Sequence, residues 1–448
     1  INQLSDLTYK HIMDLYTCTE CGRCSDNCPA YITGKKLSPK HLTLASRDHL
    51  YATEDAMFGK DALVAEPSDT PAEEPESSSG EEPIHTVPAA PEGGYFVGET
   101  VVDLVPNILH PDVIWGCTSC RACEEQCPVM ISYVDKIVGM RREEVMMKNE
   151  FPGELQGAFN GIETNGNPWN LSAMDRGDWA DGLDIPTLSD KPDAEVLYWV
   201  GCAASSDDRA KKVARAVSKL LKKARVDFAI LGTEETCTGD PARRAGNEYL
   251  FQMLAEQNIE TLNGYEASKK TIITACPHCF NTLANEYSDF GGMYDVVHHS
   301  DFLNGLLVAG KLVPSRAVKG KVVYHDSCYL GRYNQIYDSP RQILESNEGL
   351  ELTEVPYWTK KKGLCCGAGG AQMFMEEHGE RVNNKRTLQL LDTGATTIAS
   401  GCPFCMTMLT DGLKDAEKDQ EIAQRDIAEI LADAIELNEV EQTPVAAE

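Results

Sequence analysis

The run CTSCRACEEQCP at residues 117–128 sets the pattern of this chain, because four cysteines fall in the spacing C-x2-C-x2-C-x3-C directly before a proline. The run CTECGRCSDNCP at residues 18–29 repeats that spacing and the proline. The chain has seventeen cysteines in 448 residues, and they occur in such tight groups rather than scattered through a small secreted domain. This usage indicates metal ligands kept as reduced thiolates, and hence a cytosolic setting, rather than a disulfide framework.

The two runs predict a pair of cubane 4Fe-4S clusters with crossed ligation. In such a run three closely spaced thiolates hold one cluster and the fourth reaches the other. Zinc also binds C-x2-C pairs, but a zinc site needs neither the third cysteine, nor the proline, nor a matched second copy. The predicted ligand sets are Cys18, Cys21, Cys24 and Cys127 for one cubane, and Cys117, Cys120, Cys123 and Cys28 for the other.

The amino-acid composition indicates which classes of molecule the chain binds. Lys and Arg total 41 against 70 Asp and Glu, a formal charge of −29, which repels nucleic acid and anionic lipid headgroups. We therefore expect partners that are proteins or small molecules, and no nucleic acid. No apolar stretch approaches the roughly 20 residues that span a bilayer, so we expect a multidomain chain that does not itself cross a membrane.

The first 150 residues read as a helical dicluster ferredoxin domain. Its two cysteine runs are separated by a Pro-, Glu-, Ser- and Gly-rich stretch at 65–94, which we expect to be a disordered insert. A polar connection at 151–195 follows, and its Trp169 and Trp179 indicate a strap that packs over a neighbouring unit.

From residue 196 onward the sequence repeats itself. VLYWVGC, which ends at Cys202, matches KVVYHDSC, which ends at Cys328, and TIITACPHC at 271–279 matches TTIASGCPFC at 396–405. A third match aligns Asp301 with Asp426. Strand-like and amphipathic helical patterns alternate, which predicts two pseudo-symmetric α/β units with mostly parallel sheets, at 196–315 and 316–440. Sites in such sheets lie where the strands end, and the cysteines occupy those positions.

The two repeats differ in their number of thiolates. Where the second repeat reads CCG the first reads CTG, so Thr238 stands in place of one cysteine. A lone strand cysteine is usually a small buried hydrophobe, but matched groups in two repeats favour metal ligation. The second repeat offers Cys328, Cys365, Cys366, Cys402 and Cys405, and the first offers Cys202, Cys237, Cys276 and Cys279.

The CCG motif and the run CTGDPARRAGNEYLFQ resemble the cysteine-rich domains of the heterodisulfide reductase family, in its B and D subunits. The resemblance covers almost the whole chain, because the D subunit also carries a ferredoxin pair. It implies that the five cysteines of the second repeat ligate a noncubane 4Fe-4S cluster, the site of catalysis. For the first repeat an ordinary cubane, a modified cluster or no cluster stay open, and we favour the ordinary cubane.

Thr238, together with CTECGRCSDNCPAYITGKKLSPKHL and the NPWN segment, makes the chain similar to the soluble part of electron-transferring-flavoprotein:menaquinone oxidoreductases. That likeness implies an iron–sulfur electron-transfer subunit on the cytoplasmic face of the inner membrane. It also implies a flavoprotein donor, and a cytochrome b-type domain, upstream of Ile1 or in a partner, that passes electrons to the quinone pool.

Three other functions stay open from the sequence: a heterodisulfide or thiol-disulfide reductase, an iron–sulfur subunit of a lactate or glycolate oxidase, and a redox-inert zinc scaffold. The absence of a G-x-G-x-x-G after a strand and of a P-loop argues against a nucleotide or flavin of its own.

Other charged residues near the cysteines have a functional and a structural interpretation. His325, Asp326 and His278 lie beside cysteines, where they either tune a cluster or satisfy local hydrogen bonds. Arg243 and Arg244 face either an anionic group or nearby acids such as Asp240 and Glu248. The basic stripe at 211–223 is either a docking face or the solvated side of a helix.

Overall fold

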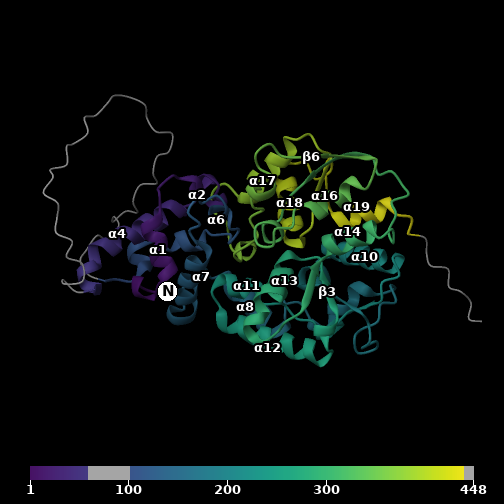
Figure 1. Ribbon diagram of the computed structural model, residues 1–448, viewed down its shortest axis with the longest axis horizontal. Helices are drawn as coiled ribbons and strands as arrows, with labels where there is room; N and C mark the ends of the chain where they lie inside the picture. The colour runs from purple at the N-terminus through teal and green to yellow at the C-terminus, as the bar shows by residue number, and fades with distance from the viewer. Residues whose placement is uncertain (59–100, 438–448) are drawn as a thin grey trace, which may run out of the picture.

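The computed structural model describes residues 1–58 and 101–437, and the predicted insert at 65–94 lies outside them. A helical domain forms one end of the molecule, and two α/β units lie beside each other at the other end (Figure 1). No helix among the described residues is both long and apolar enough to span a membrane.

The N-terminal domain is built from short helices around the two cysteine runs. Thr8 caps the first helix by accepting a hydrogen bond from the His11 amide, and Pro29 occupies the first turn of the helix that follows Cys28. Leucine and isoleucine side chains from both halves of the domain form its core. The helices are α1 (Tyr9–Thr17), α2 (Arg23–Asp26), α3 (Pro29–Ile32), α4 (Pro39–Phe58), α5 (Pro111–Trp115), α6 (Ala122–Glu125) and α7 (Val134–Arg142).

Each repeat contains a four-stranded parallel sheet, in the orders β2-β1-β3-β4 and β6-β5-β7-β8. The matching orders confirm the predicted duplication of a parallel α/β unit. The strands of the first sheet are β1 (Val196–Trp199), β2 (Phe228–Ala229), β3 (Thr271–Thr274) and β4 (Asp295–His298). Those of the second are β5 (Gly320–Tyr324), β6 (Leu350–Thr353), β7 (Thr397–Ser400) and β8 (Ala423–Asp426).

The alignment of Asp301 with Asp426 is wrong. Thr274 pairs with His298 in the first sheet, and Ser400 pairs with Asp426 in the second. His298 and Asp426 each cap the helix that follows their strand, so these two residues are equivalent. Sequence matching placed them three residues apart because both segments carry an aspartate near the start of the helix.

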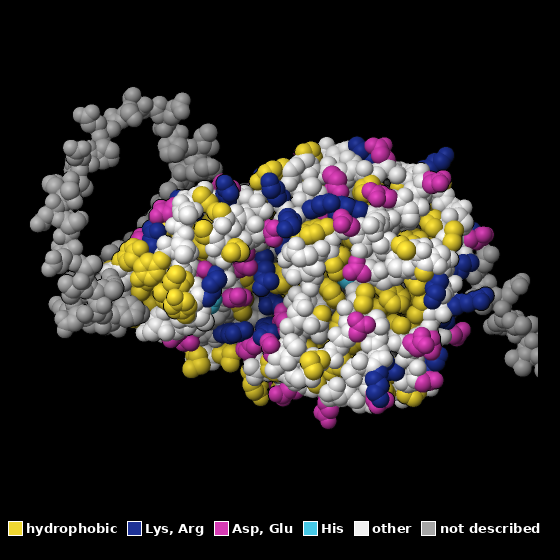
Figure 2. Space-filling view, viewed as in Figure 1, with side chains coloured by type: hydrophobic (Ala, Val, Ile, Leu, Met, Phe, Trp, Pro, Cys, Tyr) yellow, Lys and Arg dark blue, Asp and Glu magenta, His cyan; other side chains and the backbone are white. Residues whose placement is uncertain are grey.

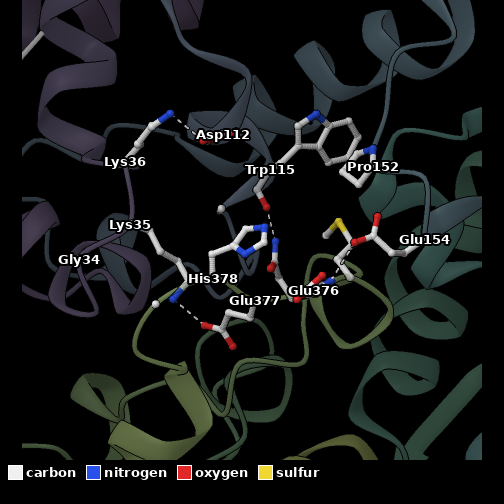
Figure 3. Close-up of a pocket in the computed structure, with 14 residues that line it drawn as sticks. Gly34, Lys35, Lys36, Asp112, Trp115, Pro152, Glu154, Glu376, Glu377 and His378 are labelled. Atoms are coloured by element: carbon white, nitrogen blue, oxygen red, sulfur yellow. Dashed lines mark hydrogen bonds and ion pairs between the residues drawn. The ribbon is translucent and has the colours of Figure 1, made fainter. Parts of the chain in front are cut away.

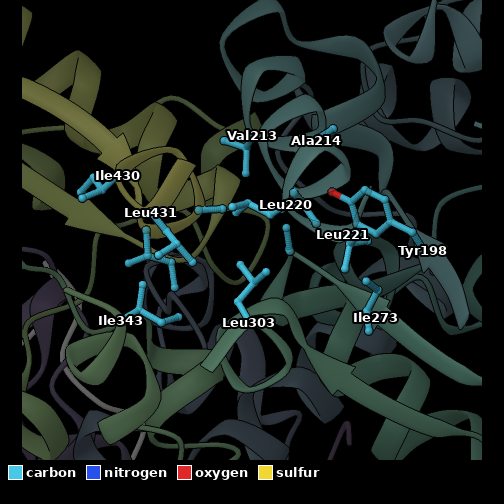
Figure 4. Close-up of a cluster of buried hydrophobic side chains, with 14 of the residues drawn as sticks. Tyr198, Val213, Ala214, Leu220, Leu221, Ile273, Leu303, Ile343, Ile430 and Leu431 are labelled. Carbon is cyan, nitrogen blue, oxygen red and sulfur yellow. The ribbon is translucent and has the colours of Figure 1, made fainter. Parts of the chain in front are cut away.

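The helices of the two repeats share a core. α10 (Asp208–Lys223) packs on α19 (Ile427–Ala434), and the equivalent pair α14 (His299–Val308) and α16 (Asp338–Glu345) also pack together. Figure 4 shows their side chains interleaved, among them Leu220, Leu303, Ile343 and Leu431. This reciprocal packing gives the repeats their pseudo-twofold relation. The remaining helices are α9 (Cys202–Ser206), α11 (Asp240–Ala245), α12 (Glu248–Gly264), α13 (Pro277–Asn281), α15 (Cys328–Gly331), α17 (Val382–Leu391) and α18 (Pro403–Asp415).

The segment between the domains packs against the first repeat through Trp179. It contains α8 (Leu155–Asn165) and a 3-10 helix (Ala173–Ala180). Trp179 is 3% exposed and lies edge-on to Tyr198, with 6.0 Å between ring centroids. Arg215 of α10 donates to the Trp179 and Asp181 carbonyls. Part of the basic stripe of α10 therefore binds the strap rather than an external partner.

A glycine pair closes the second repeat against the ferredoxin domain. A Cβ on Gly369 would lie 2.4 Å from the Thr118 carbonyl oxygen, and one on Gly370 would lie 2.2 Å from that of Cys117. Gly370 also has a φ of +65°, which side chains with a Cβ rarely adopt. The GAGG run after the CCG motif thus permits backbone contact between two cysteine loops.

Replacing Gly370 with alanine is expected to lower the free energy of unfolding by about 2 kcal/mol or more, because the added methyl group meets backbone that cannot move aside. Gly305, inside α14 with open space around it, is the matched control. Its replacement by alanine should stabilise the protein by roughly 0.5–1 kcal/mol. Urea unfolding of both variants checks the prediction, and equal stabilities would contradict it.

Candidate metal centres

The first predicted ligand set converges on one cavity. Cys18, Cys21, Cys24 and Cys127 line it, together with Lys40 and Tyr133. Cys127 comes from the second run, so the fold brings the crossed ligand to the first run. Cys21 alone of the seventeen cysteines, all of which lie in the described part of the chain, is exposed. This set therefore reaches the protein surface.

The four cysteines of the second predicted set are all buried, namely Cys28, Cys117, Cys120 and Cys123. Burial raises the pKa of Cys28, and the charges of Cys120 and Cys117 raise it further. The pKa of Cys123 is raised in the same way, by burial and then by neighbours that include Cys28. The Ser119 amide donates to Cys117 Sγ at 3.3 Å. Crowded thiols whose charges oppose one another are the arrangement that a bound cation relieves.

Tyr133 connects the two sets. Burial raises the pKa of Cys24, while the Tyr133 hydroxyl donates a hydrogen bond to its sulfur. Tyr133 also packs with Cys123 of the second set. Its phenol therefore lies between the two ferredoxin sites.

Replacing Tyr133 with phenylalanine is expected to lower the reduction potential of the cluster at Cys24 selectively, because a hydrogen bond to a ligand sulfur stabilises the more negative reduced state. An electron paramagnetic resonance (EPR) titration of both ferredoxin signals measures the shift. The cluster at Cys117 serves as the internal control. An equal shift of both potentials would contradict a specific role for this hydroxyl.

The five cysteines of the second repeat form a continuous run of sulfurs. Cys328 donates to Cys365, and Cys366 accepts hydrogen bonds from Cys365 and Cys405, which lower its thiol pKa to about 5. Burial opposes ionisation of Cys402, but the hydrogen bond from Cys405 and the charge of His278 lower its pKa to about 7. All five are buried, with at most 5% of each exposed. The site therefore brings five hydrogen-bonded sulfurs together and is sealed from solvent.

The four cysteines of the first repeat also line a single cavity, namely Cys202, Cys237, Cys276 and Cys279. Thr238 lies in its wall, with Oγ1 3.9 Å from Cys279 Sγ. Pro403 and Phe404 of the second repeat complete the lining. The threonine thus occupies the position that a fifth thiolate holds in the other repeat.

Arg176 of the strap forms a buried ion pair with Glu235 of the first repeat. Arg176 donates to Glu235 at 2.9 Å, and Glu235 accepts the amides of Val200 and Gly201 just before Cys202. Burial opposes the charge of Arg176, but Glu235 and the thiolate of Cys202 raise its pKa. Sequence analysis missed this pair, because neither residue belongs to a motif.

The four cysteine sets lie in one connected series. Cys120 of the ferredoxin domain donates to Cys365 of the second repeat, and the charges of Cys402 and Cys276 act on each other across the repeats. A series of stacked side chains lies beside the cysteine sets. Arg121 lies 4.0 Å above the ring of Tyr333, Tyr333 stacks on Tyr329 at 4.2 Å, and Tyr329 stacks on His278 at 3.9 Å.

Three of the charged residues near the cysteines, Asp326, Arg243 and Arg244, have the structural role rather than the functional one. Asp326 binds Arg341 through both carboxylate oxygens, at 2.8 and 2.9 Å, which is a structural role. Arg244 pairs with Asp240 and Glu286, and Arg243 pairs with Glu286 and Glu248, so these arginines face acids.

The two histidines lie against the cysteine sites. Burial lowers the pKa of His278, but the Asp240 carboxylate 2.8 Å away outweighs burial and raises it. His325 has a ring nitrogen within 4.8 Å of the sulfurs of Cys366 and Cys405. Both histidines are therefore placed to act on the groups that the cysteines bind.

A cavity of about 480 Å³ opens where the ferredoxin domain meets the second repeat (Figure 3). Trp115, Pro152 and Met375 supply its apolar wall. Lys35 is held by Glu377 at 2.6 Å and Lys36 by Asp112 at 2.8 Å. Because these cations are already paired, the cavity presents no free charge from them to a ligand.

Comparison with known proteins agrees with this arrangement. Residues 14–131 match the 4Fe-4S dicluster domain, and residues 196–284 and 322–410 match the cysteine-rich domain CCG. The chain is 41% identical to the EtfAB:quinone oxidoreductase of Syntrophomonas wolfei, over 97% of this chain and 60% of that protein. It is 40% identical to the probable iron-sulfur-binding oxidoreductase FadF of Bacillus subtilis, over 97% of this chain and 61% of that one.

A further relative matches from end to end. The D subunit of the dihydromethanophenazine:CoB–CoM heterodisulfide reductase of Methanosarcina barkeri is 28% identical over 97% of both chains. The chain spans about three fifths of the length of the two bacterial relatives. The chain therefore carries one 4Fe-4S dicluster domain and two cysteine-rich domains of the CCG family, the domains that the matched residues show.

Proposed function

We propose that the chain passes electrons from a reduced electron-transferring flavoprotein to a cytochrome b-type membrane partner that reduces menaquinone. The observation that carries this proposal is the connected series of cysteine sets, buried at the CCG end and exposed only at Cys21. Iron–sulfur clusters, when bound, supply one-electron carriers whose potentials the protein adjusts through hydrogen bonds and burial.

The cysteines divide into four proposed ligand sets. The two ferredoxin sets would each hold a cubane 4Fe-4S cluster, and the five cysteines of the second repeat would hold a noncubane 4Fe-4S cluster. The first repeat would hold a cubane on its four cysteines. The cavities and the mutually opposing thiolate charges support this assignment.

The surface around the first ferredoxin set suits a docking face for the membrane partner. Tyr9, Met13 and Tyr16 lie along α1 and are 40–81% exposed, and Tyr51 and Met130 extend the same apolar area. Lys10 of α1 donates to the Met130 carbonyl, which places this loop beside the helix, and Met130 is close in sequence to Cys127. Figure 2 shows hydrophobic side chains gathered on the N-terminal domain. Such patches mark interaction sites.

Replacing Met130 with glutamate is expected to slow menaquinone reduction at least about tenfold, because docking would then bury an unpaired charge. Met293 of the first repeat is a matched control, since it is 75% exposed against 78% for Met130. Its replacement by glutamate should leave the rate unchanged. The measurement is the flavoprotein-to-menaquinone rate with the membrane partner present, and equal rates for both variants would contradict the assigned face.

The proposed activity itself is tested by omitting the membrane partner. Reduced flavoprotein should then still reduce the clusters of the chain, whereas turnover of a menaquinone analogue should be lost. Rapid quinone turnover by the chain alone would overturn the proposal. The proposed location, the cytoplasmic face of the inner membrane, follows from the same partners.

A disulfide reductase is the second candidate, favoured by the end-to-end match to the heterodisulfide reductase chain. Against it stand the burial of all five CCG cysteines and the threonine at position 238. A new EPR signal from the second repeat on addition of a thiol would support this candidate. An unchanged spectrum would remove it.

A further inference from the structure

Three buried N–H groups surround the cysteines of the second repeat and have no hydrogen-bond partner among the described residues. They are His325 Nε2, Arg386 Nη2 and Arg332 Nη2. Buried donors are nearly always paired in folded proteins, and a charged one without an acceptor is especially costly. Three such donors at one site indicate that their acceptors belong to the group the cysteines bind.

Arg332 and Arg386 are each fixed by their other nitrogens. Arg332 donates to the carbonyls of Cys120 and Gly363 at 2.6 and 2.7 Å, and the thiolates of Cys120, Cys328 and Cys365 act on its charge. Arg386 donates from Nη1 to the Trp358 carbonyl at 3.0 Å. These bonds hold each guanidinium beside the sulfurs and leave its Nη2 amino group without an acceptor among the described residues.

The hydrogen bond from Arg386 decides the tautomer of His325. Arg386 Nε donates to His325 Nδ1 at 3.1 Å, and a guanidinium can only donate, so Nδ1 carries no proton. The ring proton of the neutral imidazole is therefore on Nε2. The His325 amide donates to the Ala399 carbonyl at 2.8 Å, which fixes the residue at the end of β5.

This tautomer excludes His325 as an iron ligand. Nδ1 accepts the hydrogen bond from Arg386 and Nε2 carries the ring proton, so neither nitrogen has a lone pair left to bind a metal. A ring nitrogen lies within 4.8 Å of the sulfurs of Cys366 and Cys405. Nε2 has no partner among the described residues, so its N–H group is left to donate to a sulfur of the group that these cysteines bind.

We propose that His325, oriented by the positioning residue Arg386, donates its Nε2–H to the sulfur atoms of the cluster at Cys366 and Cys405 and thereby raises the reduction potential of that cluster. The inference rests on the proposed cluster in the second repeat. Reduction adds negative charge to the sulfurs, and a hydrogen bond stabilises the more negative state. The matching position of the first repeat is Trp199.

Pulsed EPR on the unmodified chain labelled with ¹⁵N-histidine tests the contact without any substitution. A weakly coupled nitrogen and an exchangeable proton are expected on the signal of the second repeat. A strongly coupled nitrogen would show direct iron ligation and overturn the proposal, and the absence of any coupling would overturn it as well.

A redox titration tests the consequence. His325→Leu should lower the equilibrium constant for reduction of this cluster at least tenfold, about 59 mV for one electron. His325→Gln keeps an N–H group at nearly the same place and should stay near the unmodified value. Trp199→Phe, the matched control, should leave this potential unchanged. An unchanged potential in a fully loaded His325→Leu variant would overturn the proposal.

Different results would contradict the proposed function and the role of His325. If iron and sulfide analysis finds no cluster in the second repeat of the unmodified chain, the proposed function fails. If the cluster is present and lacks the nitrogen coupling, only the role of His325 fails. If the His325→Leu variant binds no cluster in the second repeat, the pulsed EPR measurement on the unmodified chain decides whether His325 contacts the cluster.

Discussion

Replacing Cys366 with threonine is expected to abolish the noncubane cluster that we propose for the second repeat and to leave there a four-cysteine set like that of the first repeat. Thr238 and Cys366 occupy equivalent positions, each before a glycine with positive φ, +87° at Gly239 and +97° at Gly367. Cys366 is central to its site, because it accepts hydrogen bonds from both Cys365 and Cys405. Without the Cys366 sulfur, the hydrogen-bonded series is broken between Cys365 and Cys405.

Electron transfer from the flavoprotein should fall at least about 100-fold in the Cys366→Thr variant, since even partners outside the ligand shell cost 10–100-fold. Mössbauer and EPR spectra of the second-repeat site measure the loss of the noncubane cluster. The ferredoxin signals should remain. Thr238→Ser is the matched control at the equivalent position and should leave the second repeat unaltered. A Cys366→Thr variant that retains the noncubane spectrum would contradict the assignment.

Replacing Arg141 with alanine is expected to destabilise the junction of all three domains. Its buried guanidinium donates to the carbonyls of Ile114, Trp115 and Cys117 in the ferredoxin domain, to Arg244 in the first repeat and to Gly370 in the second. Burial lowers its pKa, to about 10, so it stays charged at neutral pH. The Trp115 carbonyl also accepts from Gln372, and the Ile114 carbonyl also accepts from the Cys117 amide, but the described contacts give the carbonyls of Cys117, Arg244 and Gly370 no other donor.

Alanine at this position leaves several buried carbonyls without a donor, each costing about 1–3 kcal/mol. We therefore expect a loss of about 4 kcal/mol or more in the free energy of unfolding. Urea unfolding monitored through the cluster absorbance measures it. Arg142→Ala is the matched control, because Arg142 is 40% exposed and pairs with Glu248 at the surface, a contact worth about 1 kcal/mol or less. Similar losses for the two variants would contradict the role of Arg141 in joining the three domains.

The sequence could predict the features that depend on the spacing of residues close together in the chain. The two ferredoxin runs specify their own crossed grouping, and the structure brings Cys127 to the first run. The repeated strand and helix patterns predict the two parallel sheets, because the burial period differs between strands and helices. Part of the grouping of the CCG cysteines followed from strand ends, because Cys202, Cys276, Cys328 and Cys402 each lie just after a strand.

The buried arginines could not be predicted in this way. None of these arginines belongs to a cysteine motif, and each contacts residues distant in sequence, namely Arg141, Arg176, Arg332 and Arg386. A buried guanidinium and a solvated one look alike in a sequence. The misalignment of Asp301 has a different cause, since the segment that joins β3 to β4 is shorter than the one that joins β7 to β8, and a constant offset between the repeats does not hold across it.

Electrons are expected to enter at the second repeat and to leave through the ferredoxin domain, and freeze-quench EPR after mixing with reduced electron-transferring flavoprotein tests this direction of flow most directly. We predict that the signal of the second repeat appears first and the ferredoxin signals follow, and that the Cys366→Thr variant shows neither within the same time. Ferredoxin signals that appear first, or at an undiminished rate in that variant, would contradict this direction.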